Sequence, residues 1–311
     1  MFADIDLTDP IFHDEAKATA HMEADRWPNG VTCPLCGSDN VHRMGGKTQA
    51  GMFLCNDCRD KFTVRTKTIF ERSHIPLHKW LMATHLMAAS KKSVSALQLQ
   101  RMLGLGSYRT AWFMCHRIRE AMTEKTPSPL GGAGKIVESD ETAIGGKAEN
   151  RLHHPKPPKK ALVMTMIERD GMARSFHVAN VKARTLQPVM HKIIDRNSTI
   201  MTDNLTSYQL IGRTYAGHEV VRHNRGEYAR DGVWHVNTAE CFFSLCKRAV
   251  FGAHHSVSEA HLPRYMAEWD FKFNTRKMKD GERAALALKG AEGKRLTYRQ
   301  SRSAENNQTK S

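Results

Sequence analysis

The sequence predicts a multi-domain α/β protein, in which a mixed sheet flanked by helices follows a small metal-binding domain and a helical segment. Three observations predict this fold class. Two Cys-x-x-Cys pairs occur within residues 31–66. Apolar residues recur with helical spacing over residues 75–124, and strand and helix patterns alternate over residues 136–285. The 311 residues are enough for all three parts.

The chain is strongly basic, with 47 Lys and Arg residues against 32 Asp and Glu residues and a formal net charge of +15. The first 26 residues carry seven acids and two bases, a net charge of −5, so the remainder holds +20. This excess predicts a polyanionic partner, nucleic acid first; a protein that is basic without such a partner is the alternative. No apolar run reaches the roughly 18 residues that span a bilayer, and the acidic N-terminus lacks the features of a secretory signal. We therefore expect a cytoplasmic protein without a membrane partner.

Four of the seven cysteines form two pairs, Cys33 with Cys36 and Cys55 with Cys58, separated by 18 residues. Each pair can form a tight knuckle that directs two thiolates at one ion, and four thiolates complete the tetrahedral shell of a structural Zn²⁺. Redox chemistry and a coincidental spacing are the alternatives. The pattern predicts one structural zinc ion in a zinc ribbon.

The helical segment has the pattern of a helix-turn-helix. One helix ends near Gly104, and Ser107 can cap the next. The second helix has an apolar face, and the residues expected to point away from it are Arg109, Phe113, His116 and Arg117. A glycine turn followed by a helix with an outward basic face favours DNA binding. A plain helical hairpin with a solvated basic face is the alternative.

The remaining chain reads as a mixed sheet with helices. Residues 125–135 have the composition of a linker. Three strands follow, including a hairpin that turns at Asp170-Gly171, and then a helix, a strand, a helical turn, a strand and two helices. After about residue 290 the chain becomes polar, which predicts a mobile tail.

Three acids in this region suit a divalent-metal site. Asp140 lies in a strand, Asp203 ends a later strand 63 residues on, and Glu240 lies in a helix after another 37 residues. Because alternate strand residues face opposite sides, Asp140 and Glu141 cannot both face one site, and the residues alone do not choose between them. Carboxylate oxygens suit Mg²⁺ or Mn²⁺, and two such ions promote in-line phosphoryl displacement. Each acid alone is typical of a solvated surface group, so the prediction depends on the three together.

The stretches VESDETAIGGK, TDNLTSYQLIG and HNRGEYARDGVWHVNTAECFFSLCKRAVFGAHHSVSEAHLPRYMAEWDFKFNTR, together with the paired cysteines, resemble the bacterial insertion-sequence transposases of the ISXO type. The resemblance covers about residues 25–285. It implies a DDE catalytic domain with an RNase H-like fold and two Mg²⁺ or Mn²⁺ ions.

The resemblance also implies which residues form the catalytic site. They are Asp140, Asp203, Glu240, Lys247 and Asn237. Asp140, rather than Glu141, is then the first acid of the triad. Lys247, seven residues after Glu240 on the same side of the helix, would contact DNA near the scissile phosphate, and Asn237 would have a supporting role.

Further basic residues are expected to contact DNA. The full set is Arg109, Arg117, Lys147, Arg151, Lys156, Lys159, Lys160, Lys247 and Arg248. Five of them lie between residues 147 and 160, in an expected loop that could bind phosphates or be merely solvated.

The resulting hypothesis is a DNA transposase that binds the terminal inverted repeats of its element and catalyses strand cleavage and strand transfer into target DNA. It would act at the nucleoid as a homodimer or higher oligomer. A structure-selective RNase H-like nuclease and a non-catalytic zinc-ribbon regulator are the alternatives. The expected parts are an acidic segment (1–30), the zinc ribbon (31–66), the helical DNA-binding segment (75–124), the linker (125–135), the catalytic domain (136–285) and the tail (286–311).

Overall fold

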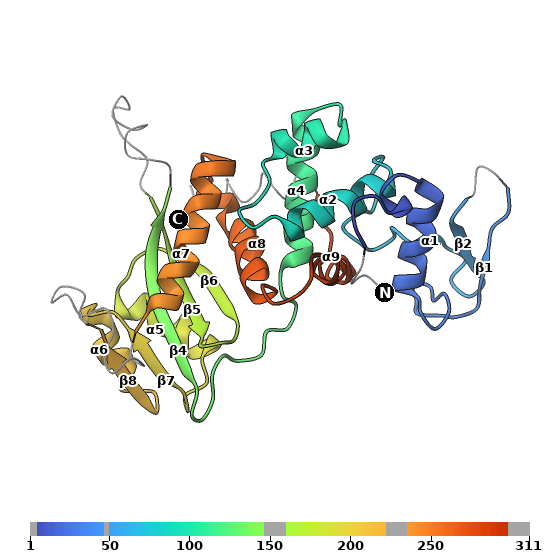
Figure 1. Ribbon diagram of the computed structural model, residues 1–311. Helices are drawn as coiled ribbons and strands as arrows, with labels where there is room; N and C mark the ends of the chain where they lie inside the picture. Colours follow the sequence, from blue (N-terminus) through green and yellow to red (C-terminus); the bar gives the residue numbers. More distant parts are fainter. Residues whose placement is uncertain (1–4, 47–49, 146–159, 222–234, 298–311) are drawn as a thin grey trace, which may run out of the picture. The chain divides into compact units, whose positions relative to one another are not determined.

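The chain forms two compact units, which Figure 1 draws in the colours of the sequence. The computed structural model describes residues 5–46, 50–145, 160–221 and 235–297. The first unit comprises residues 1–90, 94–123 and 278–311, and the second comprises residues 91–93 and 124–277. The first unit is therefore made from three separate stretches of the chain, the last of which follows the whole of the second unit. No helix in the described ranges is both long and apolar enough to cross a membrane.

The first unit combines a small antiparallel sheet with helices. Its elements are η1 (Pro10–Phe12), α1 (Glu15–Arg26), β1 (Val41–Arg43), β2 (Met52–Cys55), β3 (Lys61–Thr63), α2 (Leu77–Ala89), α3 (Ala96–Leu103), α4 (Tyr108–Met122) and α9 (Asp280–Lys289). The sheet has the order β1-β2-β3. The late helix α9 packs against α2 and α4. The predicted start of a tail at residue 286 lies inside α9, where Leu288 is buried, and Ala291 beyond it is buried as well.

The N-terminal helix α1 packs directly against the ribbon. Trp27, at its end, contacts Phe53 at 5.6 Å and Phe62 at 6.0 Å between ring centroids, and these two rings stack on each other at 5.4 Å. Arg26 donates to the carbonyl of Val64, 2.8 Å away. The aromatic core of the ribbon therefore includes a residue of the acidic N-terminal segment.

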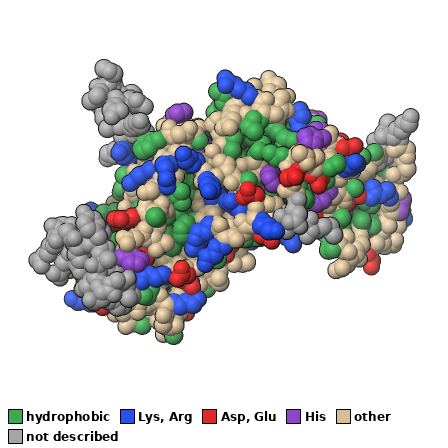
Figure 2. Space-filling view, in the orientation of Figure 1, with side chains coloured by type: hydrophobic (Ala, Val, Ile, Leu, Met, Phe, Trp, Pro, Cys, Tyr) green, Lys and Arg blue, Asp and Glu red, His purple; other side chains and the backbone are tan. Residues whose placement is uncertain are grey.

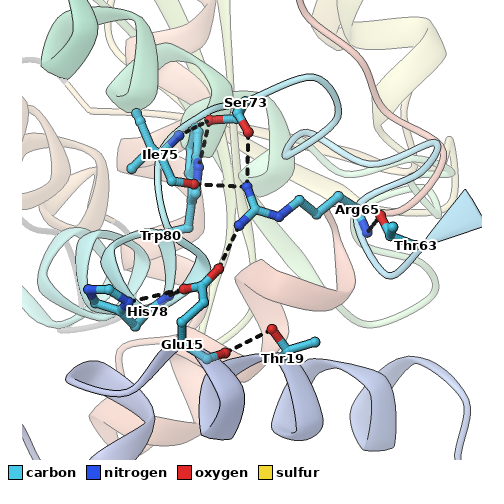
Figure 3. Close-up of polar contacts among 8 residues, drawn as sticks. All are labelled: Glu15, Thr19, Thr63, Arg65, Ser73, Ile75, His78 and Trp80. Atoms are coloured by element: carbon cyan, nitrogen blue, oxygen red, sulfur yellow. Dashed lines mark hydrogen bonds and ion pairs between the residues drawn. The ribbon is translucent and has the colours of Figure 1, made fainter. Parts of the chain in front are cut away.

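A polar cluster joins the end of the ribbon to α1 and α2 (Figure 3). The Arg65 guanidinium donates to the carbonyls of Ser73 and Ile75, at 3.0 and 2.8 Å, and to Glu15 Oε1 at 2.8 Å. The other Glu15 oxygen accepts from the backbone N–H of His78, at 3.1 Å, and contacts its Nδ1 at 3.0 Å. Because α2 has no side-chain cap of its own, Glu15 supplies the acceptor that its first turn needs.

Glu15→Ala should lower the free energy of unfolding by about 1 kcal/mol, the typical cost of losing a helix cap. The measurement is urea unfolding of the full chain. Lys17→Ala, at an exposed position on the same helix, is the control and should change little. Equal effects of the two substitutions would show that the cluster adds no stability.

The α3–α4 pair has the predicted turn, but its outward face differs from the prediction. Gly104 takes the left-handed conformation (φ 57°), and the Ser107 hydroxyl accepts from the backbone of α4 as an N-cap. The prediction that His116 and Arg117 point outward is wrong, because they are only 0% and 6% exposed. Arg117 donates to the carbonyl of Glu71 at 2.7 Å, and burial lowers its pKa to about 10. Arg117 therefore serves the packing of the first unit.

The second unit is a five-stranded sheet with helices on both faces. Its elements are β4 (Ile136–Ile144), β5 (Ala161–Glu168), β6 (Ala173–Val178), α5 (Ala183–Ile193), β7 (Thr199–Thr202), α6 (Thr206–Gly212), β8 (Gly217–Val220), α7 (Asn237–Ala249), η5 (Val250–His254), η6 (Glu259–His261) and α8 (Leu262–Asn274). The strand order is β6-β5-β4-β7-β8. The first three strands in the chain, β4 to β6, pair antiparallel, and β7 and β8 extend the sheet in parallel from β4.

Two hydrophobic cores lie on opposite faces of this sheet. Residues of α5 and α6 cover one face, and residues of α7 and α8 cover the other, where Figure 1 shows α7 lying across the strands. The predicted α/β fold with a mixed sheet is confirmed, and the arrangement is consistent with an RNase H-like domain. The predicted hairpin turn is also present, with Asp170 in a left-handed conformation (φ 59°).

The stretch expected to be a linker packs on the sheet. Leu130 is buried, and its N–H donates to the carbonyl of Ile193 at 2.7 Å. The N–H of Gly131 donates to Glu168 Oε2 at 2.9 Å. Gly131 has a φ of +84°, and the Ser198 hydroxyl occupies the space that a Cβ would need. Only glycine fits there without strain, so this part of the stretch has a fixed conformation.

A half-buried aspartate on α8, Asp270, makes the stability of the second unit depend on pH. Asp270 accepts from the N–H of Ser175, at 2.8 Å, and from its hydroxyl, at 2.6 Å. Burial raises the pKa of Asp270 from 3.8 to about 7, although the Ser175 bonds and the charge of Arg174 oppose the shift. The folded chain therefore holds a proton that the unfolded chain releases between these two values.

Asp270→Asn should flatten the pH dependence of stability. The contribution of Asp270 is fully present below about pH 4 and is lost as the pH rises toward 7, by at most about 1.4 kcal/mol per pH unit. The difference in free energy of unfolding, variant minus wild type, should therefore grow over this window and level off above it. Urea unfolding at a series of pH values measures it, and a constant difference would contradict the assignment.

Candidate active site

Two of the three candidate acids lie on neighbouring parallel strands. In the pairing of β4 with β7, Ser139 lies opposite Thr202, and the next residues along the two strands are Asp140 and Asp203. Adjacent strands are about 4.8 Å apart, so the backbones that carry the two carboxylates are direct neighbours. Asp203 lies just beyond the carboxyl end of β7, where its Oδ1 accepts from the N–H of Leu205 at 3.0 Å.

The faces of β4 distinguish Asp140 from its neighbour Glu141. The Tyr208 hydroxyl, on α6, hydrogen bonds to Glu141 and to Ser139, the latter at 3.1 Å. Glu138, one residue earlier than Ser139, instead contacts the first turn of α7. Because strand residues alternate, Asp140 belongs to the α7 face and Glu141 to the opposite one.

Glu141 lies within electrostatic reach of both aspartates. Burial raises the pKa of Glu141 to about 7, the Tyr208 hydroxyl lowers it, and the charges of Asp140 and Asp203 raise it further. Negative charges near one another raise each other's pKa, and a bound divalent cation would relieve that repulsion.

The third acid lies at the start of α7. Phe242, Phe243 and Cys246 bury one side of this helix, whereas Glu240 and Lys247 are exposed. The two charged residues are seven positions apart and so lie on the same side, two turns from each other. Both charged side chains therefore lie off the core. Asn237, the first residue of the helix, is exposed as well.

The start of α7 is fixed to β4 by a residue that the sequence analysis missed. Glu138 is completely buried, and its Oε2 accepts from the N–H groups of Thr238, at 2.9 Å, and Ala239, at 3.1 Å. Val236, the N-cap, provides no side-chain bond of its own. One local feature could have indicated such a residue. The start of α7 has no capping side chain, so its first backbone N–H groups need an acceptor from another part of the chain.

These acids suit divalent cations by their donor type, because all three offer carboxylate oxygens, the ligands that Mg²⁺ and Mn²⁺ prefer. Asp140 and Asp203 directly follow the paired residues Ser139 and Thr202, and Glu240 follows directly after a residue that is bonded to the same strand as Asp140. Their oxygen atoms do not form a compact cluster of the kind that the ribbon cysteines form.

The four ribbon cysteines do converge on a single point. Their sulfur atoms all lie within 4.8 Å of one another, and no other such cluster of three or more metal-binding side chains occurs in the described part of the chain. Cys33 and Cys58 have their sulfurs 3.8 Å apart, and Cys36 and Cys55 have theirs 3.6 Å apart. Thiolates bound to a tetrahedral Zn²⁺ at about 2.3 Å are about 3.8 Å apart, so the cluster has the dimensions of a structural zinc site.

The basic residues expected to contact DNA fall into three groups. Arg109, Lys160, Lys247 and Arg248 are exposed. Figure 2 shows Lys and Arg side chains over α7, the helix that carries the last two. Lys147, Arg151, Lys156 and Lys159 lie outside the described residues. Arg117 is buried and bonded to a backbone carbonyl, so the structure contradicts its assignment to DNA.

Two families of known proteins match separate parts of the chain, one at the ribbon and one at the five-stranded sheet. A family model described as the ISXO2-like transposase domain matches residues 129–274, and one described as the transposase zinc-ribbon domain matches residues 13–61. Over these residues the chain is similar to the ISXO2-like transposases. The ribbon match begins inside the region expected to be a separate acidic segment, in keeping with the packing of Trp27 on the ribbon core.

One relative of the chain is an uncharacterized protein in transposable element ISH50 of Halobacterium salinarum. It is 28% identical over 279 residues, which cover 84% of this chain and 91% of that protein. Among solved structures, the cryoEM structure of the simian T-cell lymphotropic virus intasome in complex with PP2A regulatory subunit B56 gamma contains a chain with a TM-score of 0.30 and 14% identity. The match covers 56% of this chain and 63% of that one. The score is too low to bear on fold or function.

Proposed function

We propose that the chain is an active transposase that joins DNA strands, with Asp140, Asp203 and Glu240 as its catalytic acids. The observation that carries the proposal is the pairing of β4 with β7, which ends at Ser139 and Thr202, the residues directly before the two aspartates, in the sheet that also anchors the helix of Glu240. The acids would hold two Mg²⁺ or Mn²⁺ ions, which supply Lewis-acid activation of the attacking oxygen and stabilisation of the leaving oxygen.

The chain's own residues would bind and orient the DNA. Lys247 and Arg248 are exposed on the helix that carries Glu240, so they can bind the phosphates beside the scissile bond. The zinc ribbon and the α3–α4 pair would bind the terminal inverted repeats of the element, with Arg109 as an exposed cation there. Two ends must be joined in one complex, which implies at least a dimer.

The test uses a labelled duplex of the element end with a free 3′-hydroxyl, a supercoiled target plasmid, the purified full-length protein and Mn²⁺. The expected product is labelled end covalently joined to the plasmid, absent with Asp140→Asn. Cleavage of an uncut end without joining would favour a nuclease. End binding with neither cleavage nor joining would favour a regulator, and both of these results would overturn the proposal.

A further inference from the structure

We propose that Glu138 is a positioning residue for the metal site: it fixes the start of α7 to β4, so that Glu240 and Asp140 can bind the same pair of ions. This inference rests on the proposed function. Glu138 itself would not touch the ions, because both of its oxygens are bonded to other groups.

Glu138 accepts three hydrogen bonds from the first turn of α7. Its Oε2 accepts two backbone N–H groups, from Thr238 at 2.9 Å and Ala239 at 3.1 Å. Its Oε1 accepts from the Thr238 hydroxyl at 2.9 Å. A carboxylate at a helix N-terminus is also favoured by the helix dipole. No part of the Glu138 side chain is exposed, so water cannot compete for these hydrogen bonds, and the carboxylate keeps one orientation.

Arg169 orients the carboxylate, and the ring of His235 lies beside it. Arg169, just after β5, donates from Nη2 to Glu138 Oε1 at 3.1 Å and to the carbonyl of His235 at 3.2 Å. The His235 ring places its Nδ1 3.4 Å from the same Oε1. Arg169 therefore connects Glu138 with the residues that lead into α7, and the entry to the helix is fixed from two sides.

The position of Glu138 in the chain relates these contacts to the candidate metal ligands. It lies two residues before Asp140 on the same face of β4, and its acceptor bond to Ala239 ends one residue before Glu240. The path from one candidate ligand to the other thus runs through three residues of β4, one hydrogen bond and one peptide unit. Such a short path transmits any change at Glu138 to the separation of the two ligands.

The test measures Mn²⁺ binding directly, from the electron paramagnetic resonance signal of free Mn²⁺, on zinc-loaded full-length protein without DNA. Glu138→Gln should raise the Kd for Mn²⁺ about tenfold or more, the usual effect of removing a residue that orients metal ligands. Asp270→Asn is the matched control, because it makes the same change at another carboxylate that joins a helix to the sheet. It should leave the Kd unchanged.

The outcomes separate this inference from the proposed function. A normal Kd in folded Glu138→Gln, with Mn²⁺ bound by the wild type, would overturn the inference alone. A wild type that binds no Mn²⁺ would overturn the proposed function as well. If Glu138→Gln does not fold, Thr238→Val removes only the hydroxyl donor. It should raise the Kd in the same direction, and an unchanged value there would overturn the inference.

Discussion

Asp140→Asn, Asp203→Asn and Glu240→Gln should each reduce Mn²⁺-dependent nicking of DNA by about 10³-fold or more while end binding remains nearly normal. Each change keeps the size of the side chain and removes the negative charge that would hold a divalent cation in the proposed function. The affinity for the element end should change little, because the proposal assigns end binding to other parts of the chain. This effect is the largest that we expect from any single substitution.

The measurement pairs a supercoiled-plasmid nicking assay with a gel-shift titration of the element end. Glu141→Gln is the control, because it makes the same type of change one residue along β4, at a side chain bonded to Tyr208 on the opposite face. It should nick far faster than Asp140→Asn. Near-normal nicking by any of the three acid variants would remove that residue from the triad, and equal losses at residues 140 and 141 would leave the first acid unassigned.

The second large effect should follow Cys36→Ser, which removes one of the four converging thiols. Structural zinc contributes about 10 kcal/mol or more to the folding of small domains, which is more than such a domain retains as net stability. We therefore expect the variant to lose its zinc, the order of the ribbon and its specific binding to element ends. The aromatic contacts of Trp27 with Phe53 and Phe62 should be lost at the same time.

Zinc content by elemental analysis and end binding by gel shift measure this prediction. Cys241→Ser removes an exposed thiol outside the cluster, so it should keep both the zinc and the binding. A full zinc content in Cys36→Ser would refute the four-thiolate site. Loss of zinc with unchanged end binding would instead show that the ribbon does not take part in recognising the ends.

Much of the fold followed from local patterns. The cap at Ser107, the turn at Asp170 and the order of strands and helices depend on residues close in the chain, and the structure has each of them. The packing of α4 did not follow. Its apolar stripe predicted one buried face, but α2 and α9 both pack against this helix, and His116 and Arg117 are buried as well. α9 lies more than 150 residues further along the chain, beyond the reach of any local pattern.

The candidate site, too, was predictable only where it depends on local patterns. Strand alternation established that Asp140 and Glu141 face opposite sides, but not which side carries α7; that depends on tertiary contacts of Tyr208 and Glu138. Glu138 itself had no signature as a functional residue, because its partners lie 100 and 101 residues away. Helix periodicity did indicate the exposed side of α7 with Glu240 and Lys247.

The chain leaves the first unit after α4 and returns to it only with α9. During synthesis, the ribosome must therefore translate the whole of the second unit before the helix that completes the first becomes available. A nascent chain released early would expose the surfaces of α2 and α4 that α9 covers in the finished protein. A complete first unit should thus accumulate only alongside a complete second unit, so prematurely terminated chains should contain no complete first unit.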